Sequence, residues 1–131
     1  MILVDTSVLI DFFKGIKNSG SIKLETILKG NIPFGISSLI YLEVLQGAGS
    51  IKEYNLLRTY LSSQRFYNPI DAVESFARAA KIYMSCRKKG ITIRSTIDCL
   101  IVETAMENNL LLLHNDHDFE LIQQVVPIKF Y

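Results

Sequence analysis

The sequence has little cysteine and no long apolar run. Among 131 residues only Cys86 and Cys99 are cysteines, and no Cys-x-x-Cys pair occurs. Both lie in helical patterns, so we predict buried free thiols in a reducing compartment, not a disulfide or a metal site. No apolar stretch approaches the roughly 18 residues of a membrane span, and the N-terminus has no basic leader. We therefore expect a cytoplasmic protein with no membrane contact.

The sequence also has little excess charge, because 14 Lys and Arg residues face 13 Asp and Glu residues for a net charge of +1. A near-neutral chain has no basic coat, so any nucleic-acid binding must use a local patch. With 49% hydrophobic and 21% charged residues, the chain is globular and not disordered. A chain of this length suits one domain with a single hydrophobic core, and the sequence has no repeat or interdomain linker. We predict a single domain spanning residues 1–131.

Short apolar strands alternate with helical patterns along the chain, which favours α/β architecture. Residues 18–21 are expected to form a loop, and residues 110–113, all leucine, to form a central strand buried on both faces. The predicted strands are 2–4, 33–36, 66–67, 110–113 and 128–131. One face of the helix expected after Asp71 carries Val73, Phe76, Ala77, Ala80 and Met84. The predicted fold is a doubly wound parallel sheet with helices on both faces.

Acidic residues stand at several boundaries of these elements. Asp5 ends the first strand, at the edge where α/β proteins bind ligands, although Asp-Thr-Ser also suits a helix cap. Glu43 lies in an apolar helix, where a carboxylate is costly unless paired or bound to metal, although a solvated face shared with Gln46 is the alternative. Asp98 lies in a first helical turn, where stabilisation of the helix dipole is the alternative. Glu103 lies about 140° further round that helix, so we expect it outside such a cluster, either supporting the metal-binding acids or in a structural role.

The segment after residues 110–113 carries Asp116 and Asp118 at another carboxyl end of a strand, where a turn and helix cap is the alternative. His114 and His117 have no zinc-like partner spacing, so we expect either ordinary loop histidines or histidines that support the acidic residues from outside. If these acidic segments converge, their like charges repel and need a counterion. An oxygen-only ligand set favours Mg²⁺ or Mn²⁺, and such sites act on phosphates.

Four motifs, in order along the chain, resemble those of PIN-domain ribonucleases, and more closely those of VapC-type toxins of toxin–antitoxin modules. They are Met1-Ile-Leu-Val-Asp5-Thr6-Ser7, Tyr41-Leu-Glu43-Val-Leu-Gln46-Gly47, Gly90-Ile-Thr-Ile-Arg-Ser-Thr96-Ile-Asp98 and Leu113-His-Asn-Asp116-His-Asp118-Phe119. Each motif alone is weak, but the ordered set is specific and spans nearly the whole chain.

The resemblance implies a metal-dependent endoribonuclease that cuts structured RNA, such as transfer RNA or a ribosomal RNA loop. It also implies a cognate antitoxin and a homodimer. Asp5, Glu43 and Asp98 match the family's acidic metal-binding residues. The fourth acid matches Asp116 or Asp118, and we favour Asp116 because it lies nearer the end of the strand. Thr6, Ser7 and Thr96 match the polar residues that surround the acids.

Binding of RNA phosphates requires positively charged side chains beside the acids. The candidates are Arg87, Lys88, Lys89 and Arg94. An ordinary solvated helix end is the alternative for these four. Two other functions are compatible with the acidic residues. One is a metal-dependent DNA nuclease or phosphatase, although an aspartyl phosphatase usually has Asp-x-Asp where this chain has Ser7. The other is a non-catalytic binding module, which the full acidic set argues against.

Overall fold

The computed structural model describes all residues, 1–131, and contains a four-stranded sheet with every pair of neighbours parallel. The strands are β1 (Ile2–Val4), β2 (Phe34–Ile36), β3 (Arg65–Phe66) and β4 (Leu111–Leu113), in the spatial order β3-β2-β1-β4. Parallel neighbours need crossover connections, and helices supply them here. The predicted α/β fold class is confirmed.

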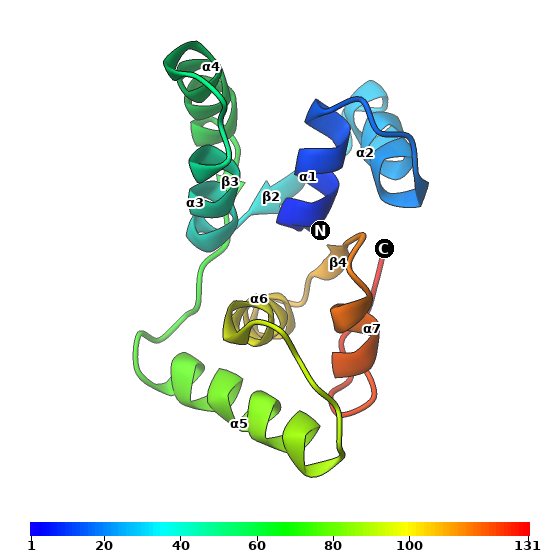
Figure 1. Ribbon diagram of the computed structural model, residues 1–131, viewed down its shortest axis with the longest axis vertical. Coiled ribbons are helices and arrows are strands. Elements are labelled where there is room, and N and C mark those ends of the chain that lie inside the picture. The colour runs from blue at the N-terminus through cyan, green and yellow to red at the C-terminus, as the bar shows by residue number, and fades with distance from the viewer.

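Seven helices surround the sheet, and none is both long and apolar enough to cross a lipid bilayer. In Figure 1, α1 to α4 occupy the upper part of the view and α5 to α7 the lower part, and β4 lies between the two groups. The helices are α1 (Thr6–Phe13), α2 (Ser19–Lys29), α3 (Ser38–Gln46), α4 (Ile51–Ser62), α5 (Glu74–Lys88), α6 (Thr96–Glu107) and α7 (His117–Ile122). The central element of the lower group is α6, which buries seven consecutive residues from Cys99 to Ala105. Cys86 and Cys99 are both buried free thiols, as predicted.

The strand β4 pairs with another strand, β1, on one side only, so it lies at the edge of the sheet. The prediction that residues 110–113 form a central strand is therefore wrong. The other side of β4 meets the last residues of the chain through one isolated parallel bridge between Leu112 and Phe130. The Leu112 amide donates to Lys129 at 2.9 Å, and the Tyr131 amide donates to Leu112 at 3.0 Å. The strand expected at residues 128–131 is therefore reduced to this bridge, which still satisfies the outer edge of β4.

The predicted loop at residues 18–21 is wrong, because α2 begins there. Asn18 caps the helix by accepting a hydrogen bond from the Ser21 amide at 2.9 Å, and the Ser21 hydroxyl accepts one from the Asn18 amide at 3.0 Å. The reciprocal pair is a capping box that uses serine where glutamate or glutamine is usual. Small polar residues that suggest a loop can thus begin a helix.

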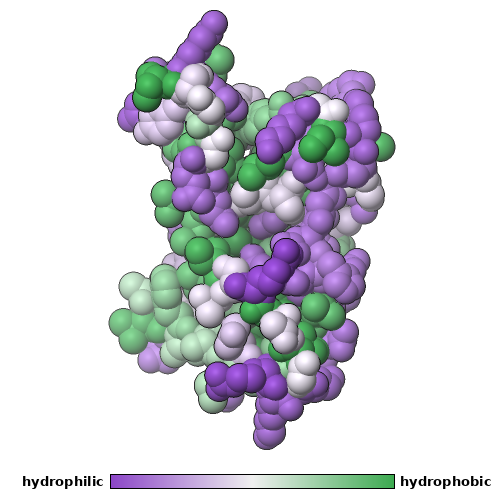
Figure 2. Space-filling model, in the orientation of Figure 1, coloured by the Kyte–Doolittle hydropathy of each residue, from purple (hydrophilic) through white to green (hydrophobic).

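The apolar face predicted for α5 is not its buried face. Val73 and Phe76 are 71% and 49% exposed, and Figure 2 shows hydrophobic atoms at the lower left, over this end of α5. The buried residues are instead Ser75, Ala79, Ile82 and Cys86. Two of these four are small, which lets α5 pack closely against α6. Arg78 then donates to Glu103 at 3.0 Å and to Glu107 at 2.8 Å. Of the two roles expected for Glu103, this ion pair gives it the structural one.

The register of the sheet brings distant acids together. Val4 of β1 lies opposite Leu113 of β4, and the Asp5 amide donates to Leu113 at 2.9 Å. Ile36 ends the neighbouring strand β2, on the other side of β1. Because the strands are parallel, the residues that follow them emerge at one edge, where α/β folds bind ligands.

Candidate metal centre

Asp5 follows β1 and is the N-cap of α1, so the helix-capping role suggested for this residue is present. Its Oδ2 accepts hydrogen bonds from the Ser7 amide at 3.0 Å and from the Ser7 hydroxyl at 2.6 Å. The side chain is nevertheless buried, and burial raises its pKa to about 6 against the opposing effect of these bonds, with repulsion from Glu43 adding to the rise. An ordinary N-cap carboxylate is solvated, so capping alone does not account for the burial of Asp5.

Glu43 extends from α3 toward the same edge. The Thr6 hydroxyl donates to Glu43 Oε1 at 3.0 Å, which joins the first turn of α1 to α3. The side chain is half-buried and not on a fully solvated face. Thr6 therefore contacts Glu43, and Ser7 contacts Asp5, so two of the three predicted polar neighbours contact an acid.

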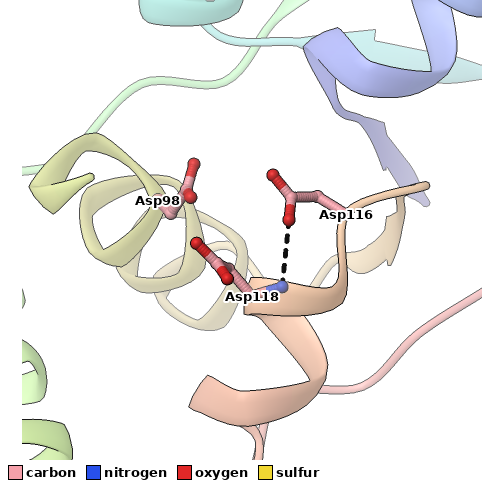
Figure 3. A group of neighbouring side chains, drawn as sticks. All are labelled: Asp98, Asp116 and Asp118. Atoms are coloured by element: carbon pink, nitrogen blue, oxygen red, sulfur yellow. Dashed lines mark hydrogen bonds between the residues drawn. The ribbon is translucent and has the colours of Figure 1, made fainter. Parts of the chain in front are cut away.

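Three further carboxylates come from α6 and from the start of α7. Asp98, Asp116 and Asp118 each offer an oxygen, and these oxygens lie within 4.8 Å of one another. Figure 3 shows the three side chains directed into one space between α6 and α7. Asp116 is the N-cap of α7 and accepts from the Asp118 amide at 3.0 Å, while Asp118 lies in the first turn and is the more buried of the two. The structure therefore brings both candidates for the fourth acid into the cluster.

Asp98 carries the most strongly perturbed carboxylate. Burial raises its pKa to about 7, and repulsion from Asp5, Asp116, Asp118 and Glu43 adds to the rise. No protein donor supplies a hydrogen bond to this carboxylate. The five predicted acids are thus electrostatically coupled around Asp98, and we call them the acidic cluster.

The residues predicted to contact RNA lie in different places. The Arg94 guanidinium faces the acidic cluster, with Nη2 2.8 Å from Asp116 Oδ1 and Nε 3.0 Å from Asp118 Oδ2. Lys89 donates to the Gln124 carbonyl at 3.2 Å, while Arg87 and Lys88 line a surface hollow with Lys81 that includes no residue of the cluster. The third predicted polar neighbour, Thr96, is exposed and makes no hydrogen bond to an acid.

Asn115 was not predicted, yet it joins β4 to the first two helices. Its amide N–H donates to the Ser7 hydroxyl at 3.0 Å, and that hydroxyl in turn donates to Asp5. Its side chain accepts from the Gly20 amide at 3.0 Å and donates to Asp11 and Asn18 at 3.0 and 2.8 Å. These partners lie 95 to 108 positions away along the chain, so the sequence gives no signal for them.

The two histidines stay outside the cluster, as expected. The His114 ring packs against Phe119 and Phe130 at centroid distances of 5.1 and 4.4 Å, and burial lowers its pKa. His117 lies 2.8 Å from Glu120. Neither they nor the cysteines contribute to the three-carboxylate group, so its possible ligands are oxygens alone. An oxygen donor set with an unpaired, half-buried carboxylate suits a hard divalent cation such as Mg²⁺ or Mn²⁺.

Residues 2–124 match the family model of the PIN domain. The chain belongs to the PIN-domain family. Along its length this PIN domain is 28% identical over 130 residues to "VapC ribonuclease Mb1587" of Mycobacterium bovis, covering 98% of this chain and 96% of that protein. It is equally similar, with the same coverage, to "Ribonuclease VapC11" of Mycobacterium tuberculosis.

Solved structures share the fold of this PIN domain. VapBC2 from Rickettsia felis, bound to a promoter DNA fragment, contains a chain that aligns with a TM-score of 0.74 at 19% identity, covering 100% of this chain and 98% of that one. A toxin–antitoxin complex from Klebsiella pneumoniae aligns with a TM-score of 0.69 at 24% identity, covering 99% and 100%. At these identities the likeness establishes the arrangement of helices and strands.

Proposed function

We propose that this PIN domain is a metal-dependent endoribonuclease of the VapC type and the toxin of a toxin–antitoxin pair. The observation that carries the proposal is the acidic cluster, in which carboxylates from three other segments of the chain act on Asp98. The ribonuclease names of the full-length relatives support RNA as the substrate. The toxin–antitoxin complexes among the similar structures support an antitoxin partner.

In this proposal Asp5, Glu43, Asp98 and Asp116 hold Mg²⁺ or Mn²⁺, and Asp118 completes the set. Thr6 orients Glu43, and Ser7 orients Asp5, through the hydrogen bonds described above. The bound metal supplies an activated water and neutralises charge that develops on the phosphate. The cation also relieves the repulsion that the five carboxylates impose on one another.

The substrate in this proposal is a structured RNA such as a transfer RNA or a ribosomal RNA loop, and its cleavage in the cytoplasm stops translation until the antitoxin binds. Arg87, Lys88 and Lys89, at the end of α5, are the proposed phosphate contacts outside the metal centre. The family resemblance also implies a homodimer as the assembly.

The test is cleavage of matched labelled RNA and DNA in Mg²⁺, with and without EDTA. We expect RNA cleavage that stops on chelation. Asp5→Asn, Glu43→Gln and Asp98→Asn each remove a charge with little change of shape. Each variant should lose more activity than the ~10–100-fold that loss of a supporting outer contact costs.

Glu74→Gln is the matched control, because Glu74 is an exposed carboxylate on α5 that belongs to no ion pair, and it should retain full activity. Circular dichroism checks that the variants are folded. Cleavage that survives exhaustive chelation would defeat the metal mechanism. Cleavage of DNA alone would identify the DNA nuclease instead, and binding without turnover would identify the non-catalytic module.

A further inference from the structure

Arg94, at the end of the segment before α6, reaches over the acidic cluster from solvent. Its side chain is 72% exposed, whereas that of Asp118 is only 9% exposed. Besides the two ion pairs, the Arg94 backbone N–H donates to Asp118 Oδ2 at 3.3 Å. One residue therefore holds two neighbouring carboxylates by three hydrogen bonds.

These hydrogen bonds engage one oxygen of each carboxylate and leave the other free. Asp116 Oδ1 accepts from Arg94 Nη2 and from the Asp118 amide. Asp118 Oδ2 accepts from Arg94 Nε and from the Arg94 amide. Asp116 Oδ2 and Asp118 Oδ1 have no protein donor. Because the guanidinium is a rigid planar fork, fixing one oxygen of each group also fixes the direction of the other.

We propose that Arg94 is a positioning residue that orients Asp116 and Asp118 toward Asp98, so that the three carboxylates can bind a divalent cation together. This inference rests on the proposed metal centre and replaces the expectation that Arg94 contacts RNA phosphate. An exposed ion pair contributes little to stability by itself. The contribution of Arg94 is instead the geometry that it imposes on its two partners.

Two rival roles predict different results. If Arg94 acted only as a counter-charge, its loss would make the cluster more negative and would tighten cation binding. If Arg94 contacted RNA phosphate, its loss would raise the KM for RNA and leave cation binding unchanged. Positioning alone predicts weaker cation binding in a cluster that has become more negative.

The experiment is calorimetric titration of the RNA-free protein with Mn²⁺, comparing wild type, Arg94→Gln and Arg94→Lys. We expect the dissociation constant to rise by at least ~10-fold in Arg94→Gln, within the range for lost outer-shell partners of metal ligands. Arg94→Lys keeps the charge but not the planar fork, so it should restore only a small part of the affinity. The backbone N–H of residue 94 remains in both variants, so Asp118 keeps one donor.

Arg58→Gln is the control, because Arg58 is an exposed arginine of α4 without an ion pair, and its loss should leave the Mn²⁺ affinity unchanged. Steady-state cleavage at saturating Mn²⁺ should then show an unchanged KM for RNA in Arg94→Gln. Tighter Mn²⁺ binding, full rescue by lysine, or no Mn²⁺ binding by wild type would each overturn the proposal. Mn²⁺ binding is measured without RNA, so a failure to cleave RNA would count against the proposed function alone.

Discussion

At the scale of single residues, Asp98 has the least compensated charge in the acidic cluster. Its ordinary pKa is 3.8, and in the folded protein without metal its pKa rises to about 7. Between these values the folded state binds more protons than the unfolded state, so the free energy of unfolding falls as pH increases. The loss levels off about one pH unit above the folded pKa. Asp5, with a pKa of about 6, contributes in the same direction.

Asp98→Asn should therefore stabilise the protein in EDTA at pH 8 but not at pH 4, because asparagine cannot ionise. We expect a Tm at pH 8 that is higher than that of wild type by several degrees, since ~1 kcal/mol corresponds to roughly 2–8 °C in domains of this size. Thermal melts followed by circular dichroism at the two pH values measure the difference. An equal shift at both values would show that the effect does not come from ionisation.

The sequence pointed to the acids more readily than to the residues that support them. Asp5, Asp98 and Asp116 each mark the end of a strand or the start of a helix, and such boundaries can be read from local patterns. The direction of Arg94 depends on how α6 and α7 pack together, and a basic residue near acids suggests RNA binding equally well. Asn115 has no local pattern at all, because its hydrogen-bond partners Ser7, Asp11, Asn18 and Gly20 all lie far away along the chain.

At the scale of elements, the contact between α2 and the loop after β4 depends on Gly20. A Cβ at this position would collide with the Asn115 side-chain amide. Replacing a helical glycine by alanine normally stabilises a protein by ~0.5–1 kcal/mol. Here Gly20→Ala should instead destabilise it by ~1–3 kcal/mol, the range for overpacked sites. Chemical denaturation measures the difference.

A double substitution separates the collision from other effects of the new methyl group. With Asn115→Ala in place, Gly20→Ala should be much less costly, because the colliding amide is gone and the two changes are coupled. Gly47→Ala is the control, since a Cβ there meets only ordinary contacts, the nearest at 3.5 Å from the Val44 carbonyl. Additive costs for Gly20→Ala and Asn115→Ala would show that the pair is not in contact.

The sequence predicted most elements but not the details that depend on packing between them. The strand at residues 2–4 and the helix after Ser37 follow from apolar runs and capping residues, which act locally. The start of α2 was missed because its cap uses Ser21 in an unusual role. The buried face of α5 was missed because Ser75 and Ala79 are buried for their small size, and hydrophobicity does not reveal this.

At the scale of the whole molecule, metal binding should be linked to stability. A cation that binds only the folded state raises the free energy of unfolding by ~2.7 kcal/mol at a concentration of 100 times its dissociation constant. Mg²⁺ should therefore raise the Tm of wild type, and more at pH 8 than at pH 6, where Asp98 retains protons that the metal must displace. Differential scanning calorimetry at matched ionic strength measures this. The same rise in Asp98→Asn would place the binding site elsewhere.

The parallel pairing of β1 with β4 also sets a time at which the molecule becomes complete. The hydrogen bond between Ser7 and Asn115 joins residues 108 positions apart. At a synthesis rate of about 5–20 residues per second, Ser7 leaves the peptidyl-transferase centre about 5–22 seconds before Asn115 is added. Until then β1 lacks a neighbour on one side, and two of the five acids, Asp116 and Asp118, have not been made. A ribosome that makes this chain therefore meets no complete acidic cluster until Asp118 has been added.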